Sequence, residues 1–408
     1  MRATFAYKIR FYFDRPRWLA STLSQALESF PAVIVTGPRQ SGKTTFVVQE
    51  LGTGAEYITF DDPLNRRFAQ DDPRGFVAQF GQKRVILDEV QYAAGLLPLL
   101  KIDIDSNRGT MGRWVLTGSQ QFQLMRNVSE SLAGRIAVLE LLPFTLLELS
   151  DPPPDLDAAV WTGLYHSPSL DTKSRDLWMR AYVATYVERD VRQLQNVQNL
   201  DLFERSMGVL AARHSQVFNS SEIARVCGVS LPTVRMWTGV LRASYLCVFL
   251  PPYPRNYGKR LLKSPKAYFL DPGVVCYMTL QPSGAAALAG PMGGSLFEGL
   301  IVAEANKVFS ALGKKPALYY WRSKDGLEVD LLIQIGARLH AVEIKLTATP
   351  TPRHCEPLSR FIELAGPDAE PSGTLVCRVD RQLALPGGHR ALPWQDFSNW
   401  LRGRLEAE

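Results

Sequence analysis

A short segment near the N-terminus constrains the fold more than any other part of the chain. Residues 32–36 read AVIVT, a run of apolar and β-branched residues that is typical of a buried strand. The next residues, GPRQSGKT at 37–44, carry Gly37, Gly42 and Lys43, and a helical pattern follows them. A strand, a glycine-rich turn and a helix in this order are typical of a loop whose backbone N–H groups point inward at phosphate oxygens. The segment therefore predicts an α/β domain built on a parallel sheet.

Other apolar runs support a parallel sheet over the first part of the chain. They are short, bounded by turns and separated by helical patterns, and they lie at 57–60, 84–90, 113–119 and 136–144. Near-continuous apolar strands with intervening helices are typical of sheets that are covered on both faces. A proline-rich acidic stretch at 150–159 and a small-residue stretch at 282–295 predict two boundaries. The predicted domains are 1–150, 151–282 and 283–408.

The loop residues have definite expected roles. Lys43 should reach the β and γ phosphates, and the Thr44 hydroxyl can bind Mg²⁺. The helix N-terminus adds a dipole that favours an anion. The residues predicted to bind the nucleotide are Gly37, Pro38, Arg39, Gln40, Ser41, Gly42, Lys43, Thr44, Thr45 and Asp88.

An acid pair ends the predicted strand near residue 85. Asp88 and Glu89 fall at the carboxyl edge of the sheet, where ligands bind in open α/β folds. Asp88 is expected to hold Mg²⁺, and Glu89 is expected to polarise the attacking water. A polar residue at the tip of the following strand, Ser119 or Thr117, can touch the γ-phosphate or that water. The pattern predicts nucleotide hydrolysis rather than binding alone.

These segments resemble the prokaryotic AAA+-like ATPases that carry a C-terminal domain of unknown function. The resemblance rests on GPRQSGKTT, VILDEVQ, LTGSQQFQL and SLAGRIAVLELLPFTLLEL, in that order, and it extends over nearly the whole chain. It implies ATP and Mg²⁺ as cofactors and Ser119 or Thr117 as the residue called sensor 1. It also implies that Arg135 is a trans-acting arginine finger, and hence a homo-oligomer. From the residues alone, Arg135 can serve its own site, a neighbour's site or a surface salt bridge.

Positive charge is concentrated in one block of the chain. The net charge is +6, and residues 205–266 hold ten Lys and Arg residues against one acid, Glu222. Such a block either attracts a polyanion or forms a solvated basic face. Within it, residues 220–228 predict a short helix with a serine N-cap, and Ser230 caps a second helix at 231–244.

A two-stranded wing is predicted after these helices, which is typical of a winged helix whose second helix lies in the DNA major groove. Winged helices also serve as interaction or lid modules in ATPases, and the sequence leaves both readings open. The predicted DNA contacts are Thr233, Arg235, Arg242, Lys259 and Arg260.

The C-terminal third carries a second group of polar residues. Asp330 lies in LEVDLLIQ, Glu343 and Lys345 lie in HAVEIK, and both segments read as adjacent strands. The spacing, with Glu298 on the preceding helix, resembles the PD-(D/E)xK nuclease fold. That resemblance implies that Glu298, Asp330 and Glu343 ligate Mg²⁺, and that Lys345 positions or activates water or neutralises phosphate. The alternative is a set of cross-strand salt bridges such as Asp330–Lys345.

The predicted fold class is therefore α/β: a P-loop NTPase sheet, then a helical winged-helix-like domain, then a small nuclease-like α/β domain. The expected function is an Mg²⁺-dependent ATP hydrolase that binds DNA and cleaves it. The alternative is an ATP-gated regulatory or assembly switch that binds nucleic acid or protein without cleavage. The sequence shows no apolar run of about 18 residues, no secretion signal and five scattered cysteines without CxxC spacing. These features favour a cytoplasmic protein without a membrane span, disulfide framework or zinc site.

Overall fold

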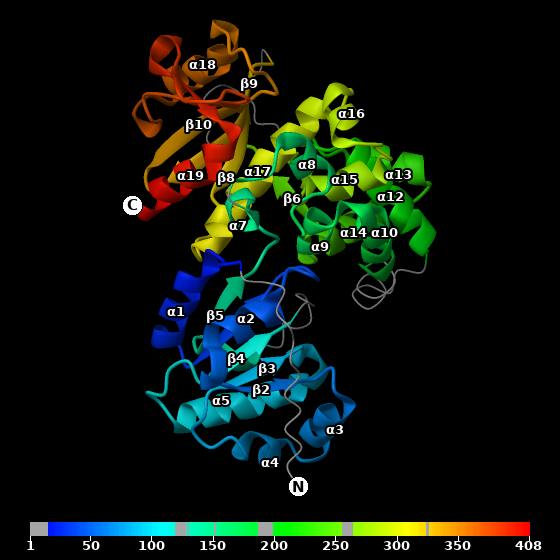
Figure 1. Cartoon of the computed structure of the whole chain (residues 1–408), viewed down its shortest axis with the longest axis vertical. Coiled ribbons are helices and arrows are strands. Elements are labelled where there is room, and N and C mark those ends of the chain that lie inside the picture. The colour runs from blue at the N-terminus through cyan, green and yellow to red at the C-terminus, as the bar shows by residue number, and fades with distance from the viewer. Residues whose placement is uncertain are drawn as a thin grey trace.

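The computed structural model describes residues 15–118, 128, 130–150, 152–186, 199–254, 264–323 and 326–408. These residues form two lobes (Figure 1). The lower lobe contains the N-terminal sheet, and the upper lobe contains the remaining helices and two further sheets. The predicted site residues Ser119, Lys259 and Arg260 lie outside the described residues.

The lower lobe is a five-stranded parallel sheet with helices on both faces. Its strands are β1 (Ala32–Thr36), β2 (Glu56–Thr59), β3 (Val85–Asp88), β4 (Trp114–Thr117) and β5 (Ile136–Glu140). Its helices include α1 (Leu19–Ser29), α2 (Lys43–Leu51), α3 (Pro63–Asp71), α4 (Pro73–Ala78) and α5 (Leu97–Ser106). The strand order is β2-β3-β4-β1-β5 and every pairing is parallel. The predicted parallel sheet is confirmed.

This order determines which loops meet. Because β4 lies between β1 and β3, the carboxyl ends of these three strands are neighbours. β1 is buried along its whole length: Val33 and Val35 pack with α1 and α2, whereas Ala32 and Ile34 pack with the opposite set of helices, α3 to α5. The strand at 84–90 is shorter than predicted, because Glu89 has a φ of 56° and cannot continue it.

The middle of the chain is helical, as predicted. Its helices include α7 (Leu146–Leu149), α8 (Leu156–Trp161), α9 (His166–Leu170), α10 (Arg175–Thr185), α12 (Leu200–Ala212), α13 (Ser220–Cys227), α14 (Leu231–Ala243), α15 (Pro272–Met278) and α16 (Gly284–Ala289). A two-stranded antiparallel sheet of β6 (Cys247–Leu250) and β7 (Lys266–Phe269) follows α14.

The two predicted caps in this region have different outcomes. Ser230 caps α14 and its side chain accepts a hydrogen bond from the Thr233 N–H, as expected. The serine cap of the preceding helix is wrong. Asn219 is the N-cap of α13, and its side-chain oxygen accepts from the N–H groups of Ser221 and Glu222. Both residue types cap well, so the residue one position earlier replaced the predicted one.

The C-terminal part is a mixed six-stranded sheet. Its strands are β8 (Leu318–Arg322), β9 (Glu328–Ile335), β10 (Arg338–Ile344), β11 (Thr374–Cys377), β12 (Leu383–Ala384) and β13 (Arg390–Pro393), in the order β12-β13-β11-β10-β9-β8. Its helices include α18 (Glu356–Ala365) and α19 (Phe397–Glu406). The antiparallel β9–β10 register pairs Val342 with Leu331. Glu343 and Asp330 are the next residues of β10 and β9 beyond this pair.

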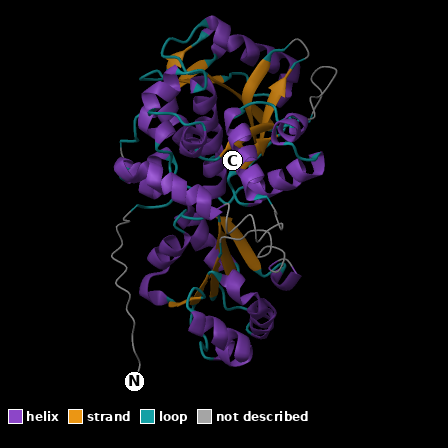
Figure 2. Ribbon diagram, turned by 90° about the vertical axis from the view of Figure 1, so that its right-hand side faces the viewer, coloured by secondary structure: helices purple, strands orange, loops and turns teal. Residues whose placement is uncertain are grey.

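One helix lies at the centre of the molecule. In α17 (Gly293–Ala311), sixteen of nineteen residues are buried, so this helix is covered on all sides. It contacts α1 and β5 of the lower lobe, β7 and α15 of the helical part, and β10 and α19 of the C-terminal part. Figure 2 shows helices surrounding the sheets of the upper lobe. One hydrophobic core runs from Phe144 to Leu405, so it is continuous across the boundary expected near residue 282.

Two further observations concern the chain as a whole. No helix in the described part of the chain is long and apolar enough to span a membrane. All five cysteines lie among the described residues, where they are buried and form no disulfide.

Candidate functional site

The loop after β1 adopts a strained backbone that sets its amide groups. Gly37, Gln40 and Gly42 have positive φ angles of 145°, 59° and 86°. A Cβ atom at Gly37 would lie 2.2 Å from the carbonyl oxygen of Leu141, so only glycine fits there. The Ser41 hydroxyl donates to the Pro38 carbonyl at 3.0 Å and closes the loop. Successive backbone N–H groups in such a turn form a concave anion site.

Lys43 is the first residue of α2, at the positive end of that helix dipole. Only 6% of the residue is exposed. Its Nζ donates to the carbonyls of Gly37 at 3.1 Å and Pro38 at 2.7 Å. The ammonium group therefore lies directly against the loop, within the reach of any phosphate that the loop holds.

The carboxylate of Asp88 joins three strands and the loop. Its Oδ1 accepts from the Thr44 hydroxyl at 2.6 Å and from the Thr117 hydroxyl at 2.5 Å. Its Oδ2 accepts from the Tyr57 hydroxyl at 2.9 Å. The structure thus brings together the predicted Mg²⁺ ligands Thr44 and Asp88. Carboxylate and hydroxyl oxygens are hard donors that suit Mg²⁺, so the residues present fit this ion.

Glu89 lies next to this group in a strained conformation. Its backbone N–H donates to the Thr117 hydroxyl at 3.2 Å, and its carboxylate accepts from the Gln91 amide. Burial raises the pKa of Glu89, and Lys43 opposes that rise. A carboxylate with a raised pKa is a better proton acceptor for water. Of the two residues considered for the strand tip, Thr117 reaches Asp88 and Glu89, whereas Ser119 lies outside the described residues.

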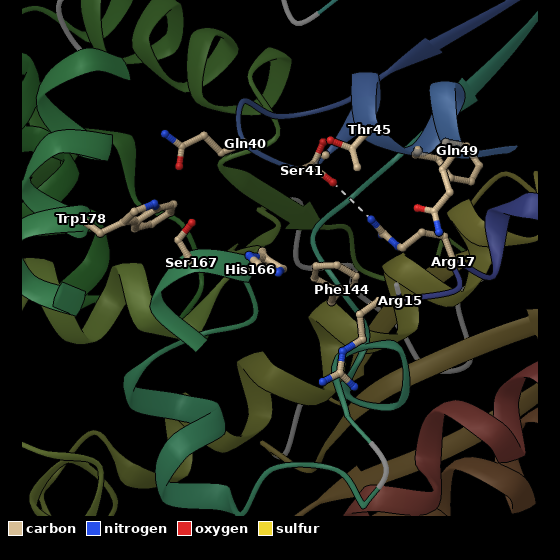
Figure 3. A pocket seen from close by; sticks show the side chains of 12 residues that line it. Arg15, Arg17, Gln40, Ser41, Thr45, Gln49, Phe144, His166, Ser167 and Trp178 are labelled. Atoms are coloured by element: carbon tan, nitrogen blue, oxygen red, sulfur yellow. Dashed lines mark hydrogen bonds between the residues drawn. The ribbon is translucent and has the colours of Figure 1, made fainter. Parts of the chain in front are cut away.

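A pocket of about 300 Å³ adjoins the loop (Figure 3). One wall comes from the loop and the start of α2, and the other comes from the helical part of the chain. Aromatic rings line the second wall at Phe144, His166 and Trp178. The Trp178 ring stacks on Tyr182, with ring centroids 5.0 Å apart. The volume and the aromatic lining are those of a small-molecule site.

Arg17 holds the loop, β5 and α7 together beside this pocket. Its guanidinium donates to the carbonyls of Ser41 at 3.2 Å and Leu142 at 2.7 Å, and to the Glu148 carboxylate at 3.1 Å. It also lies over the Phe144 ring, 4.4 Å from the centroid. Sequence reasoning missed Arg17 and the aromatic wall, because no local motif links residues so far apart in the chain.

A hydrogen bond connects the strand next to the loop with the helical part. The Tyr245 hydroxyl donates to Glu140 at the end of β5, at 2.9 Å. Tyr245 follows α14 and has a φ of 58°, a conformation that tyrosine rarely adopts. The carboxyl end of β5 is therefore tied directly to the turn after α14.

Arg135 lies far from the phosphate loop of its own chain. It immediately precedes β5, whose first residue pairs with Ala32, whereas the loop follows the other end of β1. The length of β1 separates the two, roughly 16 Å. Its guanidinium forms a bidentate salt bridge with Asp105, at 2.8 and 3.0 Å. Arg135 therefore lies at the opposite edge of the sheet from the phosphate loop of its own chain, and the surface salt bridge considered from sequence is observed.

The basic block is only partly available to a polyanion. Arg235 and Arg242 are exposed on one face of α14, and Arg242 lies over the Phe249 ring at 4.9 Å. Thr233 is half-buried, and its hydroxyl is hydrogen-bonded to Ser230. Lys266, counted with this block from sequence, is 4% exposed and contacts acids instead.

The C-terminal acids do converge. Lys345 Nζ contacts Glu343 at 2.6 Å and Asp330 at 3.0 Å, so the cross-strand salt bridge considered from sequence is present. The backbone N–H of Ile344 also donates to Asp330 at 2.9 Å. Burial, followed by the charge of Asp330, raises the pKa of Glu343 to about 8. Lys345 remains 38% exposed, which opens this end of the cluster to solvent.

Lys266 enters the same cluster from β7. Its Nζ contacts Glu298 at 2.8 Å, Asp330 at 3.9 Å and the carboxylate of Glu328. Tyr268, two residues further on, donates its hydroxyl to Glu298 at 2.6 Å. Burial, followed by the charge of Asp330, raises the pKa of Glu298 to about 7. We call Lys266, Glu298, Glu328, Asp330, Glu343 and Lys345 the acid–lysine cluster.

The cluster fits a cation only in part. One Glu343 oxygen, Oε2, is buried and has no hydrogen-bond partner, although the residue is only 3% exposed. An unsatisfied buried carboxylate oxygen is suited to a metal ion. In this arrangement, however, no three Asp, Glu, His or Cys side chains within the described ranges are grouped closely enough to hold one. The predicted metal ligands Glu298 and Asp330 do not contact one ion here, because the Lys266 ammonium group lies between them.

Comparison with known proteins identifies three matched segments along the chain. Residues 29–150 match the model of an AAA domain. Residues 155–284 match a domain of unknown function (DUF8612), and residues 293–397 match a second one (DUF4143). Among solved structures, the Walker-type ATPase PABY2304 of Pyrococcus abyssi is 14% identical, covers 64% of this chain and 94% of its own, and has a TM-score of 0.42. RuvB of Thermotoga maritima is 16% identical over 57% of this chain and 89% of its own, with a TM-score of 0.28.

Two mycobacterial proteins are similar over most of the chain. The uncharacterized protein Mb2031c of Mycobacterium bovis is 31% identical over 382 residues, which is 91% of this chain and 80% of the relative. The uncharacterized protein Rv2008c of Mycobacterium tuberculosis matches with the same identity and coverage. The chain therefore belongs to the family of these two proteins, and it is an AAA-like ATPase with a C-terminal domain of unknown function.

Proposed function

We propose that the protein hydrolyses ATP with Mg²⁺ and uses the nucleotide state to control a DNA-binding upper lobe that can cleave the phosphodiester backbone. One observation carries the first part of this proposal. Asp88 contacts both Thr44 and Thr117, and Glu89 lies beside them, so groups for metal binding, water activation and γ-phosphate sensing meet at one edge of the sheet.

The roles at this edge follow from the contacts. The loop amides and Lys43 bind the phosphates, and Thr44 and Asp88 are placed to hold Mg²⁺, which would neutralise phosphate charge. Glu89 takes the proton of the attacking water. Thr117 fixes Asp88 and the Glu89 amide at their relative positions. The base and ribose would fill the aromatic pocket beside the loop, where Trp178 offers a stacking surface.

Two substitutions test the hydrolysis mechanism. Lys43→Ala removes the cation at the loop and should abolish ATP binding in a fluorescent-nucleotide titration. Glu89→Gln keeps the shape of the side chain but removes the base, so it should bind ATP and turn it over at least about 100-fold more slowly. Unimpaired turnover by Glu89→Gln would remove Glu89 from the mechanism.

Arg135 is proposed to act on the nucleotide of a neighbouring subunit, because its own site is out of reach. It would have to exchange Asp105 for the neighbour's phosphate. Mixing two inactive variants tests this idea: Lys43→Ala supplies an intact Arg135, and Arg135→Ala supplies an intact nucleotide site. Recovery of ATPase activity on mixing supports a trans role and an oligomer, whereas no recovery, or full activity of Arg135→Ala alone, refutes it.

DNA binding is proposed for the exposed face of α14. Arg235 and Arg242 share that face, whereas Thr233 lies in the first turn of the helix and donates its backbone N–H to the Ser230 cap. The predicted contacts Lys259 and Arg260 belong to the same hypothesis. Arg235→Ala with Arg242→Ala should weaken DNA binding and lower the slope of log affinity against log salt by about 2. Arg360→Ala, a surface change on α18, is the matched control and should leave the slope unchanged.

Cleavage is proposed for the acid–lysine cluster. Glu298, Asp330 and Glu343 are the residues that would hold Mg²⁺, which would supply Lewis-acid activation of a phosphate oxygen. Lys345, at the exposed end, is placed to orient a phosphate or a water molecule. Incubation of single- and double-stranded DNA with Mg²⁺ or Mn²⁺, with and without ATP, tests this step. Cleavage that Asp330→Ala abolishes supports it.

The contacts of Lys266 favour the second candidate function, an ATP-gated switch whose C-terminal domain binds DNA or protein without cutting. In that case the lysines compensate the acids permanently and the cluster is structural. ATP-dependent changes in oligomeric state or DNA affinity, without cleavage under any metal condition, would select this function.

A further inference from the structure

The cation at the centre of the acid–lysine cluster comes from a different part of the chain than the acids. Lys266 begins β7 of the helical part, whereas the acids lie on α17, β9 and β10. Its side chain is 5% exposed, and its Nζ reaches three carboxylates. Three carboxylates around one amine favour its charged form, so the group is an ammonium ion.

The charge balance of the cluster depends on whether Lys266 is present. With Lys266 in place, its positive charge lies between Glu298 and Asp330, two of the residues expected to bind metal. Without it, four carboxylates would face Lys345 and, at 3.7 Å from Glu328, Arg322. With all four acids ionised, as metal binding requires, two negative charges would remain uncompensated, and one divalent cation would balance them. The unpartnered Oε2 of Glu343 marks a carboxylate oxygen that neither lysine satisfies.

We infer that Lys266 is an internal cation that competes with a divalent metal for the acid–lysine cluster, so that metal binds only when the Lys266 side chain withdraws. This inference rests on the metal role proposed above for Glu298, Asp330 and Glu343. The Lys266 backbone is held in two strand pairings, with Leu250 and Val217, so the side chain moves rather than the strand.

The arrangement makes metal binding depend on the helical part of the chain. β7 is paired with β6, which follows directly from α14 and the Tyr245 turn. The Tyr320 hydroxyl of β8 donates to the Ser264 carbonyl at 2.7 Å, two residues before Lys266. The helical part therefore fixes the position from which the Lys266 side chain reaches the acids of α17 and β9.

Terbium luminescence measures this competition directly. Tyr268 and Tyr320 lie against the cluster and can sensitise a bound Tb³⁺ ion, which takes the same oxygen ligands as a divalent metal. Titrations of the full chain without nucleotide compare wild type with Lys266→Met, which keeps the length of the side chain and removes its charge. The double variant Lys266→Met, Asp330→Asn gives the signal from ions bound elsewhere, including at Asp88.

We expect Lys266→Met to bind Tb³⁺ at least about tenfold more tightly than wild type, in a manner that requires Asp330. Lys307→Met is the matched control. Lys307 is a buried lysine of α17 paired with Glu304 at 3.1 Å, and its loss should not create a terbium site. Equal Asp330-dependent affinity in wild type and Lys266→Met would refute the competition and leave the metal role standing. No Asp330-dependent binding in either protein would refute both.

A second measurement uses the unmodified chain in case Lys266→Met does not fold. In protein labelled with ¹⁵N-lysine, buried ammonium groups give slowly exchanging signals, and the Lys266 signal can be assigned through its proximity to the Tyr320 ring, 5.7 Å from the centroid. Saturating La³⁺ should move the Lys266 signal or broaden it beyond detection, and should leave the Lys307 signal in place. A Lys266 signal that persists unchanged at saturation would overturn the inference.

Discussion

Arg17 offers a sharp test of how the lower lobe is joined to the rest of the chain. The change is Arg17→Ala. It removes a guanidinium that is 9% exposed and donates to two backbone carbonyls and to Glu148. Glu148 is itself 5% exposed and would keep only the backbone N–H groups of Trp18 and Thr145 as donors.

The expected magnitude follows from this burial. Removing one partner of a buried ion pair costs about 3–5 kcal/mol, because the remaining charge stays away from water. Loss of the contact with the Phe144 ring adds about 1 kcal/mol. We therefore expect the free energy of unfolding to fall by roughly 5 kcal/mol, a large part of the 5–15 kcal/mol that is typical of a folded protein. Nucleotide affinity should fall as well, since the Ser41 carbonyl loses its donor.

The assay is urea unfolding followed by circular dichroism, together with a nucleotide titration. Arg67→Ala is the matched control. Arg67 also pairs with a carboxylate, Asp71 at 3.3 Å, but both side chains are more than two-thirds exposed. Its loss should cost less than about 0.5 kcal/mol. An effect of Arg17→Ala below about 1 kcal/mol, or equal to that of Arg67→Ala, would show that the buried network does not stabilise the junction.

Three other expectations concern the nucleotide site and the buried histidine. Thr117→Ala removes a hydrogen bond to Asp88, which is worth about 1.5–3 kcal/mol, so kcat of ATP hydrolysis should fall about 10- to 100-fold with little change in nucleotide affinity. Trp178→Ala should weaken ATP binding by about 1–3 kcal/mol in a titration, and unchanged affinity would place the base elsewhere. Burial lowers the pKa of His214 from 6.5 to about 3, so the unfolded chain binds the proton more readily. The stability that this group contributes is present above pH 6.5 and is lost as the pH falls toward 3, by at most roughly 5 kcal/mol. His214→Gln should flatten the acid limb of stability against pH, and an unchanged limb would refute this role.

The lower lobe was predictable because its signals are local. A strand, a glycine-rich loop and a helix lie next to one another in the sequence, and each parallel strand is a short apolar run. The meeting of Asp88 with the loop was also predictable, since both follow strands at the same edge of the sheet. The contact of Thr117 with both acids depends on β4 lying between β1 and β3, which the sequence did not reveal.

The rest of the site depends on distant contacts. Arg17 reaches Glu148 across 131 positions, and the aromatic wall of the pocket combines Phe144, from the segment before α7, with His166 and Trp178 from two helices that carry no motif. Lys266 was counted with the basic block, because its position in the chain gives no indication that β7 packs against the acids of α17 and β9. The strand patterns and the resemblance to a nuclease fold predicted that Glu298, Asp330 and Glu343 come together, but the part played by Lys266 became visible only in three dimensions.

The burial of α17 bears on how this molecule can move. A helix that is enclosed on every side cannot slide or rotate without opening several packed interfaces at once. We therefore expect α17 to move together with the elements packed around it. The Thr22 hydroxyl of α1 donates to the Ala311 carbonyl at 2.8 Å, and the Ser310 hydroxyl donates to the Glu140 carbonyl at 2.5 Å. The C-terminal end of α17 is therefore bound to the lower lobe. Closure of the lower lobe around a nucleotide would therefore move the upper lobe as a rigid body. A chain that ends near residue 282 would lack α17, and the apolar side chains that pack against this helix would be exposed to water.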